Sequence, residues 1–204
     1  MKADKIIFAT GNAGKMKEIR MIMADLNIEV QSMKEADIQA EIVEDGETFE
    51  ENAKIKAQAI AQELRARGER AIVLADDSGL EIDYLNKEPG VYSARYMGED
   101  TSYSVKNASL IQRLEGVPDE ERTARFVCVI AAVFPDGSVF ETRATIEGRI
   151  GYEERGENGF GYDPIFYLPE YGMYSAELAP EEKNRISHRG KALEEMKKVI
   201  LTQL

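Results

Sequence analysis

The sequence predicts one α/β domain built on a mixed β-sheet with helices on its faces. In the N-terminal half, short apolar runs alternate with helical apolar stripes, which is typical of βα units. Further on, two long strand-like segments at 125–134 and 139–150 flank Pro135-Asp136-Gly137-Ser138, a sequence typical of a hairpin turn. Long antiparallel strands do not belong to a purely parallel sheet, so a mixed sheet is expected. No linker or internal repeat divides the 204 residues, which favours one domain over two independent ones.

The N-terminal elements follow from the spacing of apolar residues. Residues 6–9 predict a short buried strand, and Gly11 predicts the turn after it. The apolar stripe of the following helix consists of Ile19, Ile22, Met23 and Leu26. Thr48 and Glu51 match a capping box, so a second helix is expected to begin there and to end at Gly68. Its inward face carries Phe49, Ala53, Ala57, Ile60 and Leu64.

The strands and helices after residue 70 are predicted from the same kinds of pattern. Residues 71–75 predict a buried strand, and the alternation at 80–84 predicts another strand after Asp76-Asp77-Ser78-Gly79. A helix is expected over 103–114, closed by Gly116, and a last helix is expected after Ser187 as its cap. The inward side of that last helix carries Leu193, Met196 and Ile200.

Composition limits the classes of function. The 26 basic and 38 acidic residues give a net charge of −12, a poor field for binding long nucleic acids. A small phosphorylated ligand remains compatible, because a few lysines and a divalent cation can dominate the field of one pocket. The first apolar run is only about five residues long, far short of the roughly 18 that cross a bilayer. With no signal-peptide pattern, a soluble cytoplasmic protein without a membrane partner is expected. Cys128 is the single cysteine, so we interpret it as a small buried hydrophobe.

The segment Thr10-Gly11-Asn12-Ala13-Gly14-Lys15 lies where the first strand turns into a helix. Backbone N–H groups and the helix dipole favour an anion at such a helix start. The glycine spacing matches neither a Walker A loop nor the dinucleotide fingerprint. The segment is therefore either a phosphate-binding turn or a glycine turn with a solvated lysine.

Lys56 falls on the same helical face as the residues assigned to the core, three positions after Ala53. An inward-facing lysine needs an anionic partner or a route for its ammonium group to water. It either extends along the helix to solvent or binds a phosphate.

Asp76 and Asp77 end a buried strand, at the edge of the sheet where ligands of α/β proteins usually bind. Adjacent side chains on a strand point in opposite directions, so both can serve one site only if the backbone has already left the strand. Glu44, in an acidic loop, is a third candidate oxygen ligand. Carboxylates without a second histidine suit Mg²⁺, which typically bridges to substrate phosphates. A pair of capping or turn aspartates is the other interpretation.

The block Gly159-Phe160-Gly161-Tyr162-Asp163 places two glycines around an aromatic residue. Backbone can come close to a flat ligand there, while Phe160 or Tyr162 stacks on it. Lys183, His188 and Arg189 supply hydrogen-bond donors nearby in the sequence, and His188 is the only histidine. Together they predict a pocket for a nucleobase, although each residue alone is explained by a surface or hydrogen-bonding role.

Taken together, five motifs closely resemble the Ham1 (inosine triphosphatase) family of purine nucleoside triphosphate pyrophosphatases, in the family's order and over nearly the whole chain. The motifs are Thr10 to Lys15, Ala75-Asp76-Asp77-Ser78-Gly79-Leu80, Pro89-Gly90-Val91-Tyr92-Ser93-Ala94-Arg95-Tyr96, Gly159-Phe160-Gly161-Tyr162-Asp163-Pro164 and Ser187-His188-Arg189-Gly190. The resemblance implies hydrolysis of dITP, ITP and XTP to the monophosphate and pyrophosphate with Mg²⁺. It also implies a cytoplasmic homodimer and one elongated domain of two lobes around a central substrate cleft, with the inosine triphosphatase-like fold.

The resemblance also implies roles for individual residues. Thr10 to Lys15 and Lys56 would hold the triphosphate, and Ser78 would touch the substrate. Asp77 would act as general base and metal ligand, Glu44 as a second ligand and Asp76 as a further candidate ligand. The purine and its nearest phosphate would be surrounded by Phe160, Gly161, Tyr162, Asp163, Lys183, His188 and Arg189. Water deprotonated by Asp77 would attack the α-phosphorus, and pyrophosphate would leave.

Two other functions are considered besides purine triphosphate hydrolysis. A Maf-like pyrophosphatase would prefer pyrimidine or modified nucleotides. A non-catalytic nucleotide sensor on the same fold would need ligand contacts but neither a base nor metal-binding carboxylates, and the presence of Asp77 and Glu44 argues against it.

Overall fold

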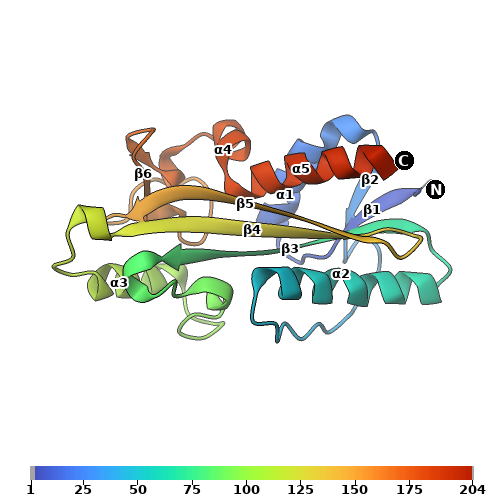
Figure 1. The fold of residues 1–204 in the computed structure, drawn as a ribbon, viewed down its shortest axis with the longest axis horizontal. Helices are drawn as coiled ribbons and strands as arrows, with labels where there is room; N and C mark the ends of the chain where they lie inside the picture. Colours follow the sequence, from blue (N-terminus) through green and yellow to red (C-terminus); the bar gives the residue numbers. More distant parts are fainter. Residues whose placement is uncertain (1–2, 204) are drawn as a thin grey trace. The chain divides into compact units, whose positions relative to one another are not determined.

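Within residues 3–203, which the computed structural model describes, the strands form one seven-stranded sheet in the order β2-β1-β3-β4-β5-β6-β7 (Figure 1). The strands are β1 Lys5–Phe8, β2 Glu29–Ser32, β3 Ala71–Ile82, β4 Thr123–Val133, β5 Val139–Ile150, β6 Phe166–Leu168 and β7 Met173–Tyr174. The α-helices are α1 Ala13–Met23, α2 Phe49–Ala66, α3 Tyr103–Arg113, α4 Pro180–Ile186 and α5 His188–Gln203.

The sheet is mixed, as the sequence predicts. β1 pairs in parallel with β2 on one side and with β3 on the other, whereas β6 pairs antiparallel with both β5 and β7. β4 and β5 are neighbours of 11 and 12 residues, joined by a turn in which the Gly137 N–H donates to the Phe134 carbonyl. The predicted pair of long strands around Pro135-Asp136-Gly137-Ser138 is therefore present.

The chain divides into two compact units, each assembled from separate segments. Unit 1 contains residues up to Asp77, Cys128–Ala144 and the chain from Arg189 onward, and unit 2 contains Ser78–Val127 and Thr145–His188. The boundaries fall inside β3, β4, β5 and α5, so no linker marks them in the sequence. Each unit has an apolar cluster of its own.

In unit 1, helices cover both faces of the strands. One apolar cluster joins Ile6 and Phe8 of β1 and Ile72 and Leu74 of β3 to buried residues of α1 and α5. The intervening strand residues, such as Val73, point to the opposite face because side chains alternate along a strand. That face is covered by α2, as Figure 1 shows. The stripe of α2 predicted from sequence is buried throughout.

The structure corrects the prediction for the middle of the chain. Instead of two strands separated at Asp76-Asp77-Ser78-Gly79, β3 runs without interruption from Ala71 to Ile82. Tyr84, expected in the second strand, lies in a short 3₁₀ helix at Asp83–Leu85. The aspartate pair is therefore part of a strand, and its two side chains leave opposite faces of the sheet.

Four elements were missed from sequence: β2, α4, and the strands β6 and β7, which span only three and two residues. β2 is only four residues long and half-exposed, without a clear apolar alternation. α4 spans seven residues and begins with Pro180, and it places Lys183 in its middle. Elements this short have too little periodicity to be recognised.

The predicted N-cap of α2 is confirmed, since the Thr48 hydroxyl accepts a hydrogen bond from the Glu51 N–H at 3.1 Å. The Glu51 carboxylate accepts from the Glu47 N–H, one residue before the position expected for a capping box. In the part of the chain that the structure covers, no helix is long and apolar enough to span a membrane.

Candidate active site

Two candidate motifs of unit 1 meet at one edge of the sheet. β1 and β3 are parallel and in register, with Phe8 opposite Leu74, and the Ala9 N–H donates to the Leu74 carbonyl at 2.7 Å. The turn at the carboxyl end of β1 therefore lies beside the β3 residues that follow Leu74, which include Asp76 and Asp77. Ligands of α/β sheets bind beyond this carboxyl edge.

The turn after β1 is organised by its own side chains. The Thr10 hydroxyl accepts from the Asn12 N–H at 3.1 Å, and the Asn12 side chain caps α1 by accepting from the Lys15 N–H at 3.1 Å. Residues 11–14 are exposed, and no acidic residue lies in the first turn of α1. This helix start is therefore accessible to an anion, and its first turn carries no carboxylate that would repel one.

The Asp76 side chain points from the face of β3 that α1 and α5 cover. Its carboxylate accepts from the Lys15 ammonium at 2.9 and 3.2 Å, and the Arg189 Nε atom lies 3.5 Å away. Burial works against the charged form of Asp76, but Lys15 and Arg189 hold its pKa well below its usual range. Asp76 therefore joins the phosphate-binding turn to the start of α5.

Arg189 is held from a second direction by a residue that the sequence analysis missed. Glu18, one helical turn after Lys15 on α1, accepts from the Arg189 Nη1 atom at 2.7 Å. The guanidinium is buried, and the carboxylates of Asp76 and Glu18 raise the pKa of Arg189 despite that burial. Arg189 also interacts electrostatically with Cys128, so that cysteine has a basic neighbour that its sequence context did not indicate.

The Asp77 side chain points from the opposite face of β3 toward α2. Its Oδ1 atom lies 3.8 Å from the Lys56 Nζ atom, which is 3.0 Å from the Glu44 carboxylate. Burial raises the pKa of Asp77 to about 6, even though Lys56 and the nearby Asn52 side chain lower it. Burial also opposes the charged form of Lys56, but the surrounding carboxylates raise its pKa above the ordinary value. The inward-facing lysine thus has anionic partners within the protein.

Asn52 is a second residue that the sequence analysis missed. It lies on α2 one turn before Lys56, and its Oδ1 atom accepts from the Gly46 N–H at 2.9 Å. A Cβ atom on Gly46 would lie 2.7 Å from that oxygen, so only glycine allows this approach. Asn52 therefore holds the acidic loop that carries Glu44 against α2. The available signal in the sequence was a polar residue, Asn52, four positions before Lys56 and therefore on the same helical face.

A divalent cation suits part of this arrangement. Glu44 and Asp77 converge on one ammonium group, and their hard oxygen atoms are the ligands that Mg²⁺ prefers. Asp76 points away from them, toward Lys15 and Arg189. Among residues 3–203, no group of three or more His, Cys, Asp or Glu side chains is arranged as a metal site. The protein residues that fit Mg²⁺ are thus Glu44 and Asp77.

In unit 2, the Gly159–Asp163 loop is closed by its last residue. The Asp163 carboxylate accepts from the Phe160 N–H at 2.9 Å and from the Lys183 ammonium at 2.8 Å. The same ammonium lies 4.9 Å from the centroid of the Phe160 ring. Of the two aromatic residues proposed to stack on a base, Phe160 is 36% exposed, whereas Tyr162 is buried and donates to the Ser93 carbonyl.

His188 is also buried, and its ring stacks on Phe126 at a centroid distance of 4.9 Å. Unit 2 thus contains Ser78, the Phe160–Asp163 loop, Lys183 and His188, whereas unit 1 contains the Thr10–Lys15 turn, Glu44, Lys56, Asp76, Asp77 and Arg189. Two unit boundaries fall between bonded neighbours of the predicted site, at Asp77–Ser78 and His188–Arg189.

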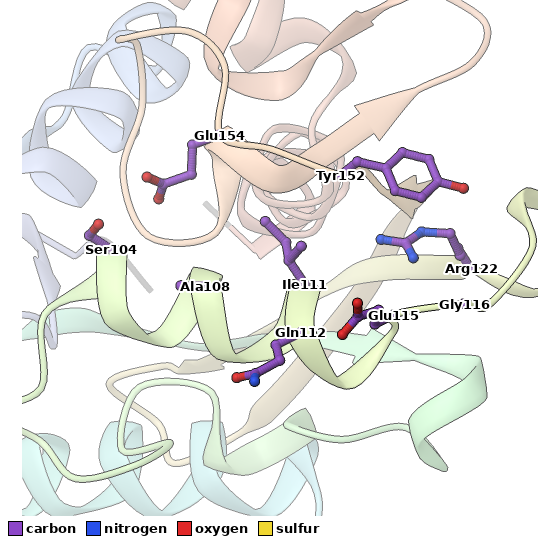
Figure 2. Close-up of a pocket in the computed structure, with 9 residues that line it drawn as sticks. All are labelled: Ser104, Ala108, Ile111, Gln112, Glu115, Gly116, Arg122, Tyr152 and Glu154. Carbon is purple, nitrogen blue, oxygen red and sulfur yellow. The ribbon is translucent and has the colours of Figure 1, made fainter.

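Unit 2 also contains a cavity of about 560 Å³ beside α3 (Figure 2). Figure 2 shows Ile111 of α3 on one side of it and Tyr152 and Glu154 on the other. The Arg122 side chain at its edge donates to backbone carbonyls at Leu114, Ile150 and Gly151. None of the residues that line the cavity belongs to the predicted site, so its size does not identify it as the reaction centre.

Comparisons with known proteins agree with the motifs. The Ham1 family profile matches residues 6–199. The chain is 49% identical over 194 residues to the dITP/XTP pyrophosphatase of Clostridium perfringens, which covers 95% of each protein. It is 46% identical to the dITP/XTP pyrophosphatase of Exiguobacterium sibiricum, with 98% of each covered. The solved structure of a HAM1 protein from Coxiella burnetii is 42% identical and superposes with a TM-score of 0.86, covering 98% of this chain and 99% of that one.

Proposed function

Since this chain belongs to the Ham1 family, we propose that it hydrolyses the non-standard purine nucleoside triphosphates dITP, ITP and XTP to the monophosphate and pyrophosphate. The bacterial relatives that share nearly half of its residues over nearly their whole length are dITP/XTP pyrophosphatases. The observation that carries the proposal is the Asp77 carboxyl, which lies in β3 just past the end of β1 and whose pKa burial raises to about 6 beside Lys56 and Glu44.

The triphosphate is assigned to unit 1. The accessible start of α1 offers backbone N–H groups, and Lys15 and Lys56 are the ammonium groups nearest to the aspartate pair. Asp76 holds Lys15 in place and has a pKa well below the usual range, so it stays charged at neutral pH. We therefore assign Asp76 a positioning role for Lys15 and Arg189 instead of a metal-ligand role.

Mg²⁺ would be held by Glu44 and Asp77, together with the phosphates of the substrate. When bound, the ion would neutralise phosphate charge and orient the leaving group. Loading can be measured by isothermal titration with Mg²⁺ in the wild type and in Glu44→Gln. Unchanged Mg²⁺ affinity and unchanged activity in the variant would remove Glu44 from the metal site.

Asp77 is assigned the role of general base. A carboxyl with a pKa of about 6 is ionised at neutral pH and is still a stronger base than an ordinary aspartate. It would take a proton from the water that attacks the α-phosphorus, and pyrophosphate would leave. In ¹⁸O-water the label should appear in the monophosphate, and label in pyrophosphate would rule out attack at the α-phosphorus. Asp77→Asn should lose several orders of magnitude in turnover.

The purine is assigned to the loop of Phe160, whose aromatic side chain is exposed and has Lys183 beside it. Inosine and xanthine carry a carbonyl acceptor at the six-position, whereas adenine carries an amino donor. His188, Arg189 or backbone N–H groups would donate to that carbonyl and would leave adenine with unpaired polar groups, which cost about 1–3 kcal/mol each. Equal catalytic efficiency on dITP and dATP would contradict this assignment.

Pyrophosphate release across dITP, ITP, XTP, GTP, ATP and dUTP, with and without Mg²⁺, tests the function as a whole. We expect Mg²⁺-dependent release from dITP, ITP and XTP and little from ATP or dUTP. A preference for dUTP would favour a Maf-like enzyme. Binding of the purine nucleotides without release from any of them would favour a sensor.

We also propose that the enzyme acts in the cytoplasm as a homodimer, and that its two units serve as the two lobes of a single catalytic domain. Light scattering of the purified protein measures the oligomeric state, and a mass of about 23 kDa would contradict the dimer, because one chain is 22.9 kDa.

A further inference from the structure

The carboxylate of Asp163 is fixed by contacts from three directions within unit 2. Its Oδ2 atom accepts from the Phe160 N–H at 2.9 Å and from the Lys183 ammonium at 2.8 Å. Its Oδ1 atom accepts from the Ser175 hydroxyl at 2.8 Å. Ser175, Asp163 and Lys183 are 5%, 3% and 6% exposed, so water has little access to replace any of these partners.

The start of the loop is packed closely against the Asp163 carboxylate. Gly159 has a φ of +79°, and a Cβ atom there would lie 2.3 Å from Asp163 Oδ2 and 3.0 Å from Lys183 Nζ. The loop is packed directly against the ion pair, so movement of the Asp163 carboxylate would move the loop as well.

Ser175 belongs to a segment that runs along this loop. The Asn158 N–H donates to the Ala176 carbonyl at 2.9 Å, and the Asn158 side chain donates to the Leu178 carbonyl at 3.0 Å. These two contacts from Asn158 hold the segment against the start of the loop. The Ser175 hydroxyl adds a side-chain contact at the end of the loop, on Asp163.

We infer that Ser175 is a positioning residue for nucleotide binding. A carboxylate can rotate about its Cβ–Cγ bond, and a hydrogen bond to Oδ1 keeps Oδ2 facing both Phe160 and Lys183. Ser175 therefore holds the exposed ring of Phe160 and the Lys183 ammonium in one fixed relation. This inference rests on the proposed function, which places the purine and its nearest phosphate against those two groups.

The test compares Ser175→Ala with Ser175→Thr, which keeps the hydroxyl. Steady-state hydrolysis of dITP should show a KM raised about ten-fold in Ser175→Ala, as expected for a lost hydrogen bond to a charged group. Turnover should stay close to that of the wild type, because Asp77 lies in unit 1 and is not altered. Ser175→Thr should keep a near-normal KM even where its extra methyl group lowers the melting temperature.

The matched control is Ser109→Ala. Ser109 is also a serine of unit 2, in α3, and its hydroxyl lies 3.3 Å from the Tyr96 hydroxyl. This variant should leave KM unchanged. A double variant of Ser175→Ala with Phe160→Leu should raise KM by less than the product of the two single effects, because Ser175 acts partly through Phe160.

The outcomes separate the inference from the proposed function. A wild-type protein that hydrolyses dITP, with an unchanged KM in Ser175→Ala, overturns the inference and leaves the function standing. An equal rise of KM in Ser175→Thr, or fully additive effects in the double variant, also overturns it. A wild-type protein that releases no pyrophosphate from dITP, ITP or XTP overturns both.

Discussion

Replacing Asp77 with Asn should stabilise the metal-free protein at neutral pH while abolishing turnover. Asp77 is 8% exposed, and burial raises the pKa of its carboxyl from 3.8 to about 6 despite the nearby Lys56 ammonium. Folding therefore disfavours the ionised carboxylate. Asparagine has nearly the same shape as the protonated acid and removes this penalty.

The direction in which stability changes with pH follows from proton binding to Asp77 in the folded and unfolded chain. Below pH 3.8 both the folded and the unfolded chain carry the proton, so Asp77 contributes no pH dependence. Between pH 3.8 and about 6 the folded chain binds the proton more tightly, so the stability of the wild type falls as the pH rises. Above about pH 6 the penalty is complete. At about 1.4 kcal/mol per pH unit it amounts to about 3 kcal/mol.

For a chain of this length, about 3 kcal/mol corresponds to a melting-temperature change of roughly 6–12 °C. The assay is thermal unfolding of wild type and Asp77→Asn in EDTA between pH 4 and 7.5. We expect the variant to melt higher at pH 7.5 and most of the difference to disappear at pH 4. Added Mg²⁺ should narrow the gap by stabilising the wild type.

The matched control is Asp83→Asn, where the sign is opposite. Hydrogen bonds from Arg125 lower the pKa of Asp83 below its ordinary value, so its charge stabilises the folded chain above the unfolded pKa and that stability is lost at acid pH. This variant should melt lower than the wild type at pH 7.5. If Asp77→Asn also melts lower, or differs from the wild type by the same amount at every pH, the burial argument for Asp77 is wrong.

Four further substitutions, one of them a control, test other parts of the structure. Asp76→Asn should lower the free energy of unfolding in urea by about 3–5 kcal/mol, because it leaves the buried Arg189 and the half-buried Lys15 without their shared carboxylate; a loss below that of an ordinary surface change would contradict the role of Asp76. Gly159→Ala and Gly172→Ala both place alanine at positive φ, but only Gly159 faces a close atom, Asp163 Oδ2 at 2.3 Å. Gly159→Ala should therefore cost about 1–3 kcal/mol more than Gly172→Ala in the same urea titration, and equal costs would show that the loop can move away. Thr48→Ala should remove the cap of α2 and lower stability by about 1 kcal/mol, measured by thermal unfolding, and an unchanged melting temperature would show that the cap is dispensable.

Much of the fold was predictable because its signals are local. The stripe of α2 and the inward face of α5 were read directly from residues at helical spacing, and these residues are buried. The turn at Pro135-Asp136-Gly137-Ser138 was recognised from residue types that favour turns. The division into two units was not predictable, because its boundaries lie within continuous strands and leave no change of composition.

The candidate site was predictable in its residue types but only partly in its arrangement. The TGNAGK turn, the aspartate pair and the aromatic glycine loop each indicate chemistry from a few neighbouring residues. The polar sequence Asp76-Asp77-Ser78-Gly79 predicts a break between two strands, but the structure has an uninterrupted β3 there. The short-range pattern failed because pairing within the sheet outweighed the low strand propensity of these residues.

By itself, the sequence determined which groups are available: hard carboxylates, lysines, one histidine and no set of imidazoles for a metal. Only the tertiary structure decided how they are grouped. Alternation along β3 sends neighbouring aspartates to opposite faces, but the partners of each depend on which helices cover those faces. Asp76 meets Lys15 and Arg189, and Asp77 meets Lys56, because helices distant in sequence pack on the same strand.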